Sequence, residues 1–171
     1  MLAKNEPASR HVLSLIVDNE PGVLGRVVGL FSGRGYNIES LTVSETEHDK
    51  HRSRITIVTS GSPAMIDQIE AQLGRLVPIH KVVDLTNSGP MVERELALIK
   101  VAGTGDARAE ALRLAEAFKA RVMDATIESF VFELTGKPDK LDQFITLMLP
   151  LGLVEVSRTG VAAISRGPQG M

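Results

Sequence analysis

The sequence contains no cysteine and no tryptophan among its 171 residues, and aromatic residues make up only 4% of it. Without cysteine the chain has no disulfide, no thiolate nucleophile and no cysteine metal site, so only histidines and carboxylates remain as metal ligands. A formal net charge of -2 provides no basic field for a polyanion. We therefore expect neither nucleic acid nor a membrane surface as a partner.

Long apolar runs are absent as well. The existing runs are too short to cross a bilayer, and the opening residues MLAKNEPASR lack the apolar core of a signal peptide. The expected location is therefore cytoplasmic. The proportions of 43% hydrophobic and 23% charged residues are ordinary for a soluble globular protein of one large domain or two small ones.

The first half of the chain alternates short β-branched runs with amphipathic runs. A predicted strand over 11–17 leads through the polar turn DNEPG to a helix over 23–33, whose apolar residues recur at spacings of three and four. The next predicted elements are strands over 38–46 and 53–60, a helix from Ser62 or Pro63, and a strand over 77–85. The predicted order is βαββαβ.

The same order repeats after the turn cluster NSGP at 87–90. The predicted elements there are strands over 95–101, 121–127 and 129–134, helices over 106–118 and from Pro138, and strands over 153–156 and 161–164 joined by the turn RTG. Two such halves predict an α+β fold of two consecutive ferredoxin-like βαββαβ sandwiches, each with both helices on one face of an antiparallel sheet. Because each core is small, we expect dimerisation to cover the open face of the sheets.

These patterns divide the chain into five segments. They are a flexible N-terminus (1–10), a first domain (11–86), a linker (87–94), a second domain (95–165) and a disordered tail (166–171).

The turn before the first helix is the main candidate site. Its glycines follow the spacing GxxGxxxG, which differs from the GxGxxG of a dinucleotide site, and Asp18 and Glu20 beside them would repel phosphate. A small zwitterion such as an amino acid suits this turn better. Gly22 allows close approach to the backbone, the N–H groups of the helix start bind a carboxylate, and Asn19 offers a donor and an acceptor.

Both polar turns around the first helix also have a purely structural interpretation. In it, Asn19 caps the helix, Pro21 sets its first turn and Gly22 relieves crowding. Similarly, the stretch GRGYN at 33–37 needs only Gly35 as a helix C-cap and Asn37 as a turn residue.

The four histidines do not indicate a metal or catalytic site. His48 and His51 flank Asp49 and Lys50 in an expected hairpin connection, but two histidines on an exposed loop lack further ligands and indicate a solvated turn. The other two, His11 and His80, lie at strand starts without a neighbouring serine or aspartate pattern for a nucleophile or relay. We predict no catalytic residues and no metal ligands.

Three stretches carry a resemblance to a known family. They are NEPGVLGRVVGLFSGRGYNIESLTV (19–43), VERELALIKV (92–101) and EVSRTGVAAISRG (155–167). Together they closely resemble the regulatory (small) subunit of bacterial acetolactate synthase, also called acetohydroxyacid synthase, over nearly the whole chain. The first half resembles an ACT domain, which is an amino-acid-sensing βαββαβ module, and the second resembles the family's C-terminal domain.

The resemblance implies a regulatory subunit without an active site of its own. Such a subunit binds the catalytic large subunit of a transferase holoenzyme, raises its activity, and transmits feedback inhibition by valine in the biosynthesis of valine, leucine and isoleucine. It implies no cofactor in this chain, whereas the catalytic partner would carry thiamine diphosphate, Mg2+ and FAD.

The resemblance also implies an effector site between two chains. In the family, ACT domains pair side by side as a homodimer, with valine between the strand-to-helix turn of one protomer and the segment after the first helix of the other. Matched residue by residue, one wall contains Asn19, Gly22, Val23 and Leu24, and the other wall contains Asn37 and Ile38 from the second chain.

Two other classes of function remain as alternatives. A freestanding amino-acid-sensing ACT protein or transcriptional regulator would share the fold, but a regulator needs a DNA-binding element, and the sequence shows no basic helix or helix-turn-helix beside the two sandwiches. A small enzyme on this fold would need convergent acid–base or metal groups, which the sequence does not display.

Overall fold

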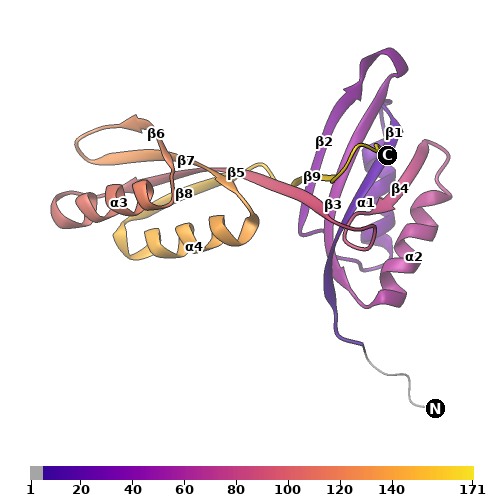
Figure 1. The fold of residues 1–171 in the computed structure, drawn as a ribbon, viewed down its shortest axis with the longest axis horizontal. Coiled ribbons are helices and arrows are strands. Elements are labelled where there is room, and N and C mark those ends of the chain that lie inside the picture. The colour runs from indigo at the N-terminus through magenta and orange to yellow at the C-terminus, as the bar shows by residue number, and fades with distance from the viewer. Residues whose placement is uncertain (1–5) are drawn as a thin grey trace. The chain divides into compact units, whose positions relative to one another are not determined.

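The structure, a computed structural model, describes residues 6–171 and divides the chain into two compact units (Figure 1). The first unit comprises the chain up to Val92 together with Val161–Met171, and the second unit is Glu93–Gly160. Within the described residues, no helix is both long enough and apolar enough to cross a bilayer.

The first unit is a ferredoxin-like sandwich. Its elements are β1 (Ser9–Asp18), α1 (Val23–Gly33), β2 (Ser40–Glu47), the 3-10 turn η1 (His48–Lys50), β3 (Arg52–Gly61), α2 (Pro63–Gly74) and β4 (Ile79–Asp84). All strands are antiparallel neighbours in the order β2-β3-β1-β4, as the predicted βαββαβ order requires. Both helices pack on one face of this sheet (Figure 1).

Strand alternation decides which side chains form the first core. Leu13, Leu15 and Val17 of β1 face the helices, while Val12 faces the other side of the sheet. The helix α1 buries Val23, Val27 and Phe31, its residues at spacings of four. The predicted helix over 23–33 is confirmed, and so is the second helix, which Ser62 caps through the N–H of Met65 and Pro63 begins.

The second unit repeats the sandwich. Its elements are β5 (Met91–Ala102), α3 (Gly105–Ala117), β6 (Arg121–Ala125), β7 (Ser129–Gly136), α4 (Pro138–Met148), the 3-10 turn η2 (Leu149–Leu151) and β8 (Leu153–Arg158). The strand order β6-β7-β5-β8 matches that of the first sheet. Phe132 and Phe144 meet edge to face in its core, with ring centroids 6.0 Å apart.

One ion pair fixes two strands of the second unit to each other and to α4. Arg158 at the end of β8 donates from Nε and Nη2 to the two carboxylate oxygens of Glu95, at 2.8 Å each, and from Nη1 to Asp142 at 2.6 Å. Glu95 is only 6% exposed, so the pair satisfies a buried charge. These hydrogen bonds raise the pKa of the Arg158 guanidinium above its ordinary value.

Several predicted boundaries were wrong. The first strand begins at Ser9 inside the expected flexible segment 1–10, of which residues 1–5 lie outside the described part of the chain. The strand β5 begins at Met91, inside the expected linker 87–94. The prediction followed the apolar residues of 95–101, whereas the strand continues into the more polar residues before them. Conversely, the strand predicted over 77–85 begins only at Ile79, and the side chain of Val77 lies in solvent at 92% exposure.

The largest correction concerns the C-terminal segment, which was expected to close the second domain at residue 165. The strand β9 (Ala162–Ser165) forms no hairpin with β8; each pairs with β5, and the segment from Val161 onward belongs to the first unit. Val161 and Ala163 are 2% and 5% exposed, in a cluster with Val12, Val58 and Leu85 on the face of the first sheet opposite the helices.

The physical reason is that this sheet face is apolar and needs a cover. We expected a second chain to provide it, but the chain's own C-terminus covers the cluster, and the yellow segment can be followed across the first sheet in Figure 1. The tail 166–171, expected to be disordered, contains no helix or strand, yet its first residue donates its N–H to the carbonyl of Pro90 at 2.9 Å.

Candidate functional site

The turn before α1 is shaped by one glycine. Gly22 is the N-cap residue with φ +87 and ψ -10, a left-handed conformation that glycine adopts without a Cβ penalty. No side chain caps this helix, so the capping role that the structural interpretation gave to Asn19 is wrong. The first main-chain bond of the helix runs from the N–H of Arg26 to the carbonyl of Gly22 at 3.0 Å.

This geometry leaves donors at the helix start. The N–H groups of Leu24 and Gly25 lie in the first turn, where an α-helix offers no intrahelical acceptor. Leu24 is 40% exposed beside them, whereas Val23 is buried in the core and fixes the turn to the sheet. Backbone N–H donors, the positive end of a helix dipole and an adjacent apolar side chain together form a surface that suits a carboxylate with a short apolar side chain.

The turn is held in place from two sides. The N–H of Asn19 donates to the carbonyl of His51 at 2.8 Å, so the β2–β3 connection supports the turn directly. On the other side, the N–H of Asp18 donates to the carbonyl of Pro78 at 2.9 Å, and its carboxylate lies 2.5 Å from Nε2 of His80. These contacts fix the backbone on which the exposed Asn19 side chain is carried.

The connection 47–51 is the part of the site that sequence reasoning missed. It was interpreted only as a solvated turn, yet His51 has φ +49 and directs its carbonyl to Asn19. A left-handed conformation is uncommon for non-glycine residues but enriched for histidine, and here it ends the 3-10 turn η1. Sequence reasoning considered only the histidine side chains, whereas the contact is made by the backbone, which has no sequence signature.

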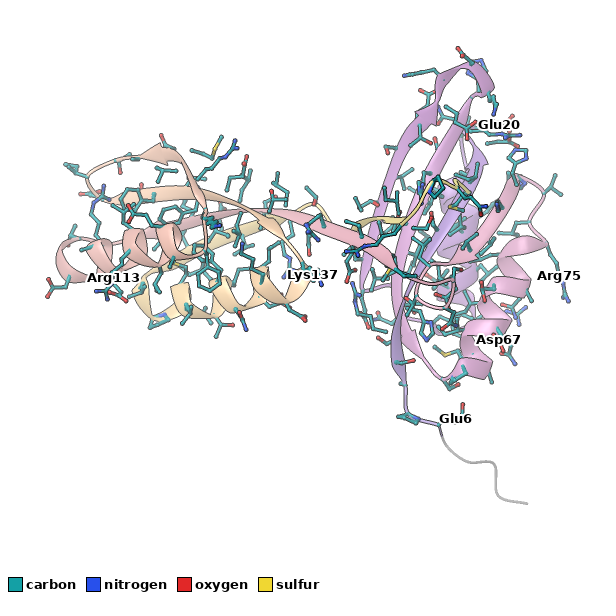
Figure 2. All side chains as sticks on the ribbon, in the orientation of Figure 1. Glu6, Glu20, Asp67, Arg75, Arg113 and Lys137 are labelled. Carbon is teal, nitrogen blue, oxygen red and sulfur yellow. The ribbon has the colours of Figure 1, made fainter. Side chains whose placement is uncertain are left out.

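Two acidic side chains lie on the outer side of the first unit, Glu20 in the turn and Glu47 at the end of β2. Figure 2 shows Glu20 projecting at the end of the first unit where β1 leads into α1. Glu47 forms an ion pair with Lys50 at 2.9 Å, and that hydrogen bond lowers the pKa of the Glu47 carboxyl below its ordinary value. The charge of Glu47 is therefore offset by Lys50, and the carboxylate of Glu20 is the group that disfavours a phosphate at the turn and is compatible with an ammonium group.

The second candidate wall follows α1. Gly35, with φ +70, is the left-handed residue after the helix, as predicted for a C-cap, and the N–H of Tyr36 returns to the carbonyl of Phe31 at 2.9 Å. Asn37 is exposed, and its carbonyl accepts a hydrogen bond from Oγ1 of Thr59 at 2.7 Å. Ile38 is half-buried against the first core.

One chain does not bring the two walls together. They lie at opposite ends of α1, whose 11 residues span about 16 Å at about 1.5 Å per residue. A free amino acid is far shorter than that. The residues Asn19, Gly22, Val23 and Leu24 therefore form one half-site and Asn37 and Ile38 another, and the assignment of these six residues to an effector stays a prediction.

The histidines have structural partners. His48 is exposed and lies 3.1 Å from a carboxylate oxygen of Glu45. Over residues 6–171, no group of three or more histidine and acidic side chains is placed to hold a metal ion. His11 is buried, with Nδ1 at 2.7 Å from Oδ2 of Asp84 and Nε2 at 2.9 Å from Oγ of Ser9, so it does have the serine and aspartate neighbours that its sequence context did not indicate.

This hydrogen-bonded chain joins β1 to β4. Asp84 is 4% exposed, and its other carboxylate oxygen accepts the N–H of Thr86 at 3.0 Å. Ser9 is the exposed first residue of β1, paired with Gly61. A reactive serine needs preorganised donors for an oxyanion as well as a relay. We interpret the Ser9–His11–Asp84 chain as a buried polar link that pins β4 to the sheet, because such groups are stable when fully hydrogen-bonded.

Glu70 on α2 faces this polar link, and its charge should reduce stability at neutral pH. Its Oε1 accepts the N–H of Asp84 at 3.2 Å, and burial, with the nearby Asp84 carboxylate, raises the pKa of the Glu70 carboxyl above its ordinary value of 4.5. The folded state therefore binds a proton more tightly than the unfolded state. The stability gained from that proton is complete below pH 4.5 and is lost as the pH rises through the folded pKa.

Glu70→Gln should therefore raise the free energy of unfolding at neutral pH, because the amide keeps the acceptor without the charge. Since Glu70 is partly exposed and screened by solvent, we expect a gain of less than about 1 kcal/mol. Urea unfolding at neutral pH and below pH 4.5 measures it, with Glu116→Gln on an exposed helix face as the control. A gain as large in acid as at neutral pH would contradict the assignment.

The fold and the uncapped start of α1 place the chain in a class of proteins with two consecutive ferredoxin-like domains, of which the N-terminal one is an ACT domain. A family model described as the AHAS small subunit-like ACT domain matches residues 13–81, and one described as the small subunit of acetolactate synthase matches residues 94–167. The chain belongs to the family of acetolactate synthase small subunits.

Individual relatives cover nearly all of the chain. The acetolactate synthase small subunit of Mycolicibacterium smegmatis is 42% identical over 94% of this chain and 94% of its own length. The acetolactate synthase isozyme 3 small subunit of Salmonella typhimurium is 45% identical over 92% of this chain and 96% of its own length. The crystal structure of the acetolactate synthase small subunit from Thermotoga maritima superimposes with a TM-score of 0.85 at 38% identity, covering 94% of this chain and 99% of that one.

Proposed function

We propose that this chain is the regulatory subunit of an acetolactate synthase, which activates the catalytic large subunit and makes it sensitive to inhibition by valine. The observation that carries the proposal is the uncapped start of α1, where a left-handed Gly22 leaves backbone donors beside an exposed Leu24. These groups match the carboxylate and the short branched side chain of valine. Membership of the family of acetolactate synthase small subunits supports the proposal that the chain binds a catalytic large subunit.

The site is proposed to form between two copies of the chain. The strand β2 begins two residues after Ile38 and is an edge of the first sheet, so it offers unpaired main-chain groups to a second β2 strand. Such side-by-side pairing would place the segment 37–38 of one copy near the turn 19–24 of the other. It supplies the second wall that a single chain lacks.

The regulatory mechanism would be linkage between two binding events. If valine binds one conformation of the small-subunit dimer more tightly, and the large subunit is active only with the other, valine lowers activity by shifting the population. A coupling of about 1–3 kcal/mol corresponds to roughly 5- to 150-fold control. The chemistry would be performed by thiamine diphosphate, Mg2+ and FAD on the catalytic subunit, and this chain would hold none of them.

Reconstitution tests the proposal directly. Adding the purified chain to its catalytic subunit should raise acetolactate formation to a plateau, and adding valine at that plateau should lower it again. Leucine and alanine serve as controls for effector identity. Activity that does not rise with the chain, or does not fall with valine, would contradict the corresponding half of the proposal.

A further inference from the structure

A second feature of the first unit contacts the strand β2 directly after residues 37–38, which we call the effector segment, without belonging to the proposed site. We define the C-terminal strap as residues 161–165, the segment that returns to the first unit from the second. Two of its side chains, Val161 and Ala163, fill the apolar cluster on the sheet face opposite the helices. The strap is therefore a packed part of this unit.

Polar contacts fix the strap to the strand that follows the effector segment. The N–H of Val161 donates to Oγ of Ser40 at 2.8 Å, and Oγ1 of Thr42 donates to the carbonyl of Val161 at 3.1 Å. A third contact runs from Nη2 of Arg54 to the carbonyl of Ala163 at 3.1 Å. Two side chains of β2 thus hold both main-chain polar groups of a single strap residue.

The end of β2 that holds the strap is also the end that follows residues 37–38. Ser40 lies two residues after Ile38, and the intervening Glu39 donates its N–H to the carbonyl of Val58 at 2.8 Å. The side chain of Val58 in turn lies in the cluster that the strap fills. The most direct connection from residues 37–38 to Val161 therefore runs along the start of β2 and through the hydroxyls of Ser40 and Thr42.

The strap is also connected covalently to the second unit. Val161 is covalently bonded to Gly160, the last residue of the second unit, and Gly160 has φ +86. Val161 is thus the residue through which the strap is joined, by one peptide bond, to the end of the second unit.

We propose that Ser40 and Thr42 are positioning residues that couple valine binding to the second unit through Val161. This proposal rests on the proposed function. The two residues do not touch the effector. Their hydroxyl groups hold the strap on β2, so that an effector-induced movement of β2 is passed to the residue where the second unit ends. Without these hydroxyls the site would still bind valine, but its occupancy would no longer be transmitted.

The double variant Ser40→Ala with Thr42→Val removes both hydroxyls and keeps the size of the threonine side chain. In the reconstituted holoenzyme we expect activation to remain, valine affinity by calorimetry to stay within about threefold, and activity at saturating valine to stay within about twofold of the valine-free activity. Ser44→Ala, on the exposed part of the same strand, is the matched control and should leave inhibition intact. Ser40→Thr with Thr42→Ser restores the hydroxyls and should restore inhibition.

Hydrogen exchange provides a readout that a purely structural role would not change. In the unaltered chain, valine should alter the protection of the peptide that contains Val161, and in the double variant this response should disappear while the helix α1 still responds.

The outcomes separate this inference from the function on which it rests. Full valine inhibition in the double variant would overturn the coupling role alone. Affinity and inhibition lost in parallel would also overturn it, because the hydroxyls would then act on the site itself. An unaltered chain that binds no valine would overturn the proposed function, and the coupling role with it.

Discussion

Gly22→Asp should abolish valine inhibition while leaving activation of the catalytic subunit intact. The new carboxylate would lie at the uncapped start of α1, where the backbone donors are proposed to bind the effector carboxylate, and it would both occupy these donors and repel the ligand. A hydrogen bond to a charged group contributes about 1.5–3 kcal/mol, so we expect the dissociation constant for valine to rise about 10- to 150-fold.

The control for this variant is Gly22→Asn. A Cβ at position 22 meets no atom within 4 Å, so both variants share the backbone strain of φ +87 and differ only in charge. Asparagine should therefore weaken valine binding clearly less than aspartate does. Calorimetry with the free chain and valine titration of the holoenzyme measure the effect. Equal losses for both variants would assign it to strain, and unchanged sensitivity in Gly22→Asp would show that the proposed site is wrong.

Gly152→Ala should lower the free energy of unfolding of the second unit more than the glycine-to-alanine substitution Gly105→Ala does. Gly152 has φ +103, and a Cβ there would lie 1.9 Å from the carbonyl oxygen of Ala102, far closer than the van der Waals radii of the two atoms allow. The colliding atoms are backbone atoms, and the N–H of Ala102 donates to the carbonyl of Gly152 at 2.8 Å, so neither side can move freely. We expect a loss of at least about 3 kcal/mol.

The matched control is Gly105→Ala in the same unit. Gly105 has φ +61 but meets nothing within 4 Å, so its replacement isolates the left-handed conformation, at a cost of about 1–2 kcal/mol. The sequence has one tyrosine and no tryptophan, and Tyr36 lies in the first unit, so its fluorescence follows that unit while circular dichroism follows both. In urea, Gly152→Ala should lose dichroism before the Tyr36 signal changes. A loss no larger than that of Gly105→Ala would contradict the steric argument.

The sandwiches themselves could be predicted from the sequence because their signals are local. The helix over 23–33 repeats apolar residues every three or four positions and ends at glycines, and Pro63 and Pro138 lie in the first turn of their helices. Gly22 was predicted to allow close approach to the backbone; the structure places it at the N-cap with a positive φ, and its role in binding an effector stays a prediction.

The strap could not be predicted, because its signals are not local. The residues of β9 alternate in the same way whether they pair with β8 or cover another sheet, and the contacts that decide the matter join residues 119 and 121 positions apart. Similarly, the support of Asn19 by His51 is a main-chain contact, to which side-chain identity contributes nothing. Contacts between residues so far apart in the sequence are decided by how the core assembles, and the local hydrophobic pattern does not predict them.

The return of the C-terminal segment also bears on how the chain is made. Synthesis proceeds from the N-terminus, and in most multidomain proteins the first domain can finish folding before the next one has emerged. Here the second unit is complete once Gly160 has been added, whereas the first still lacks Val161 and Ala163 for the cluster around Val12 and Val58. The unit that begins the chain is therefore completed last on the ribosome, and a translation product that stops at residue 92 leaves an apolar sheet face uncovered.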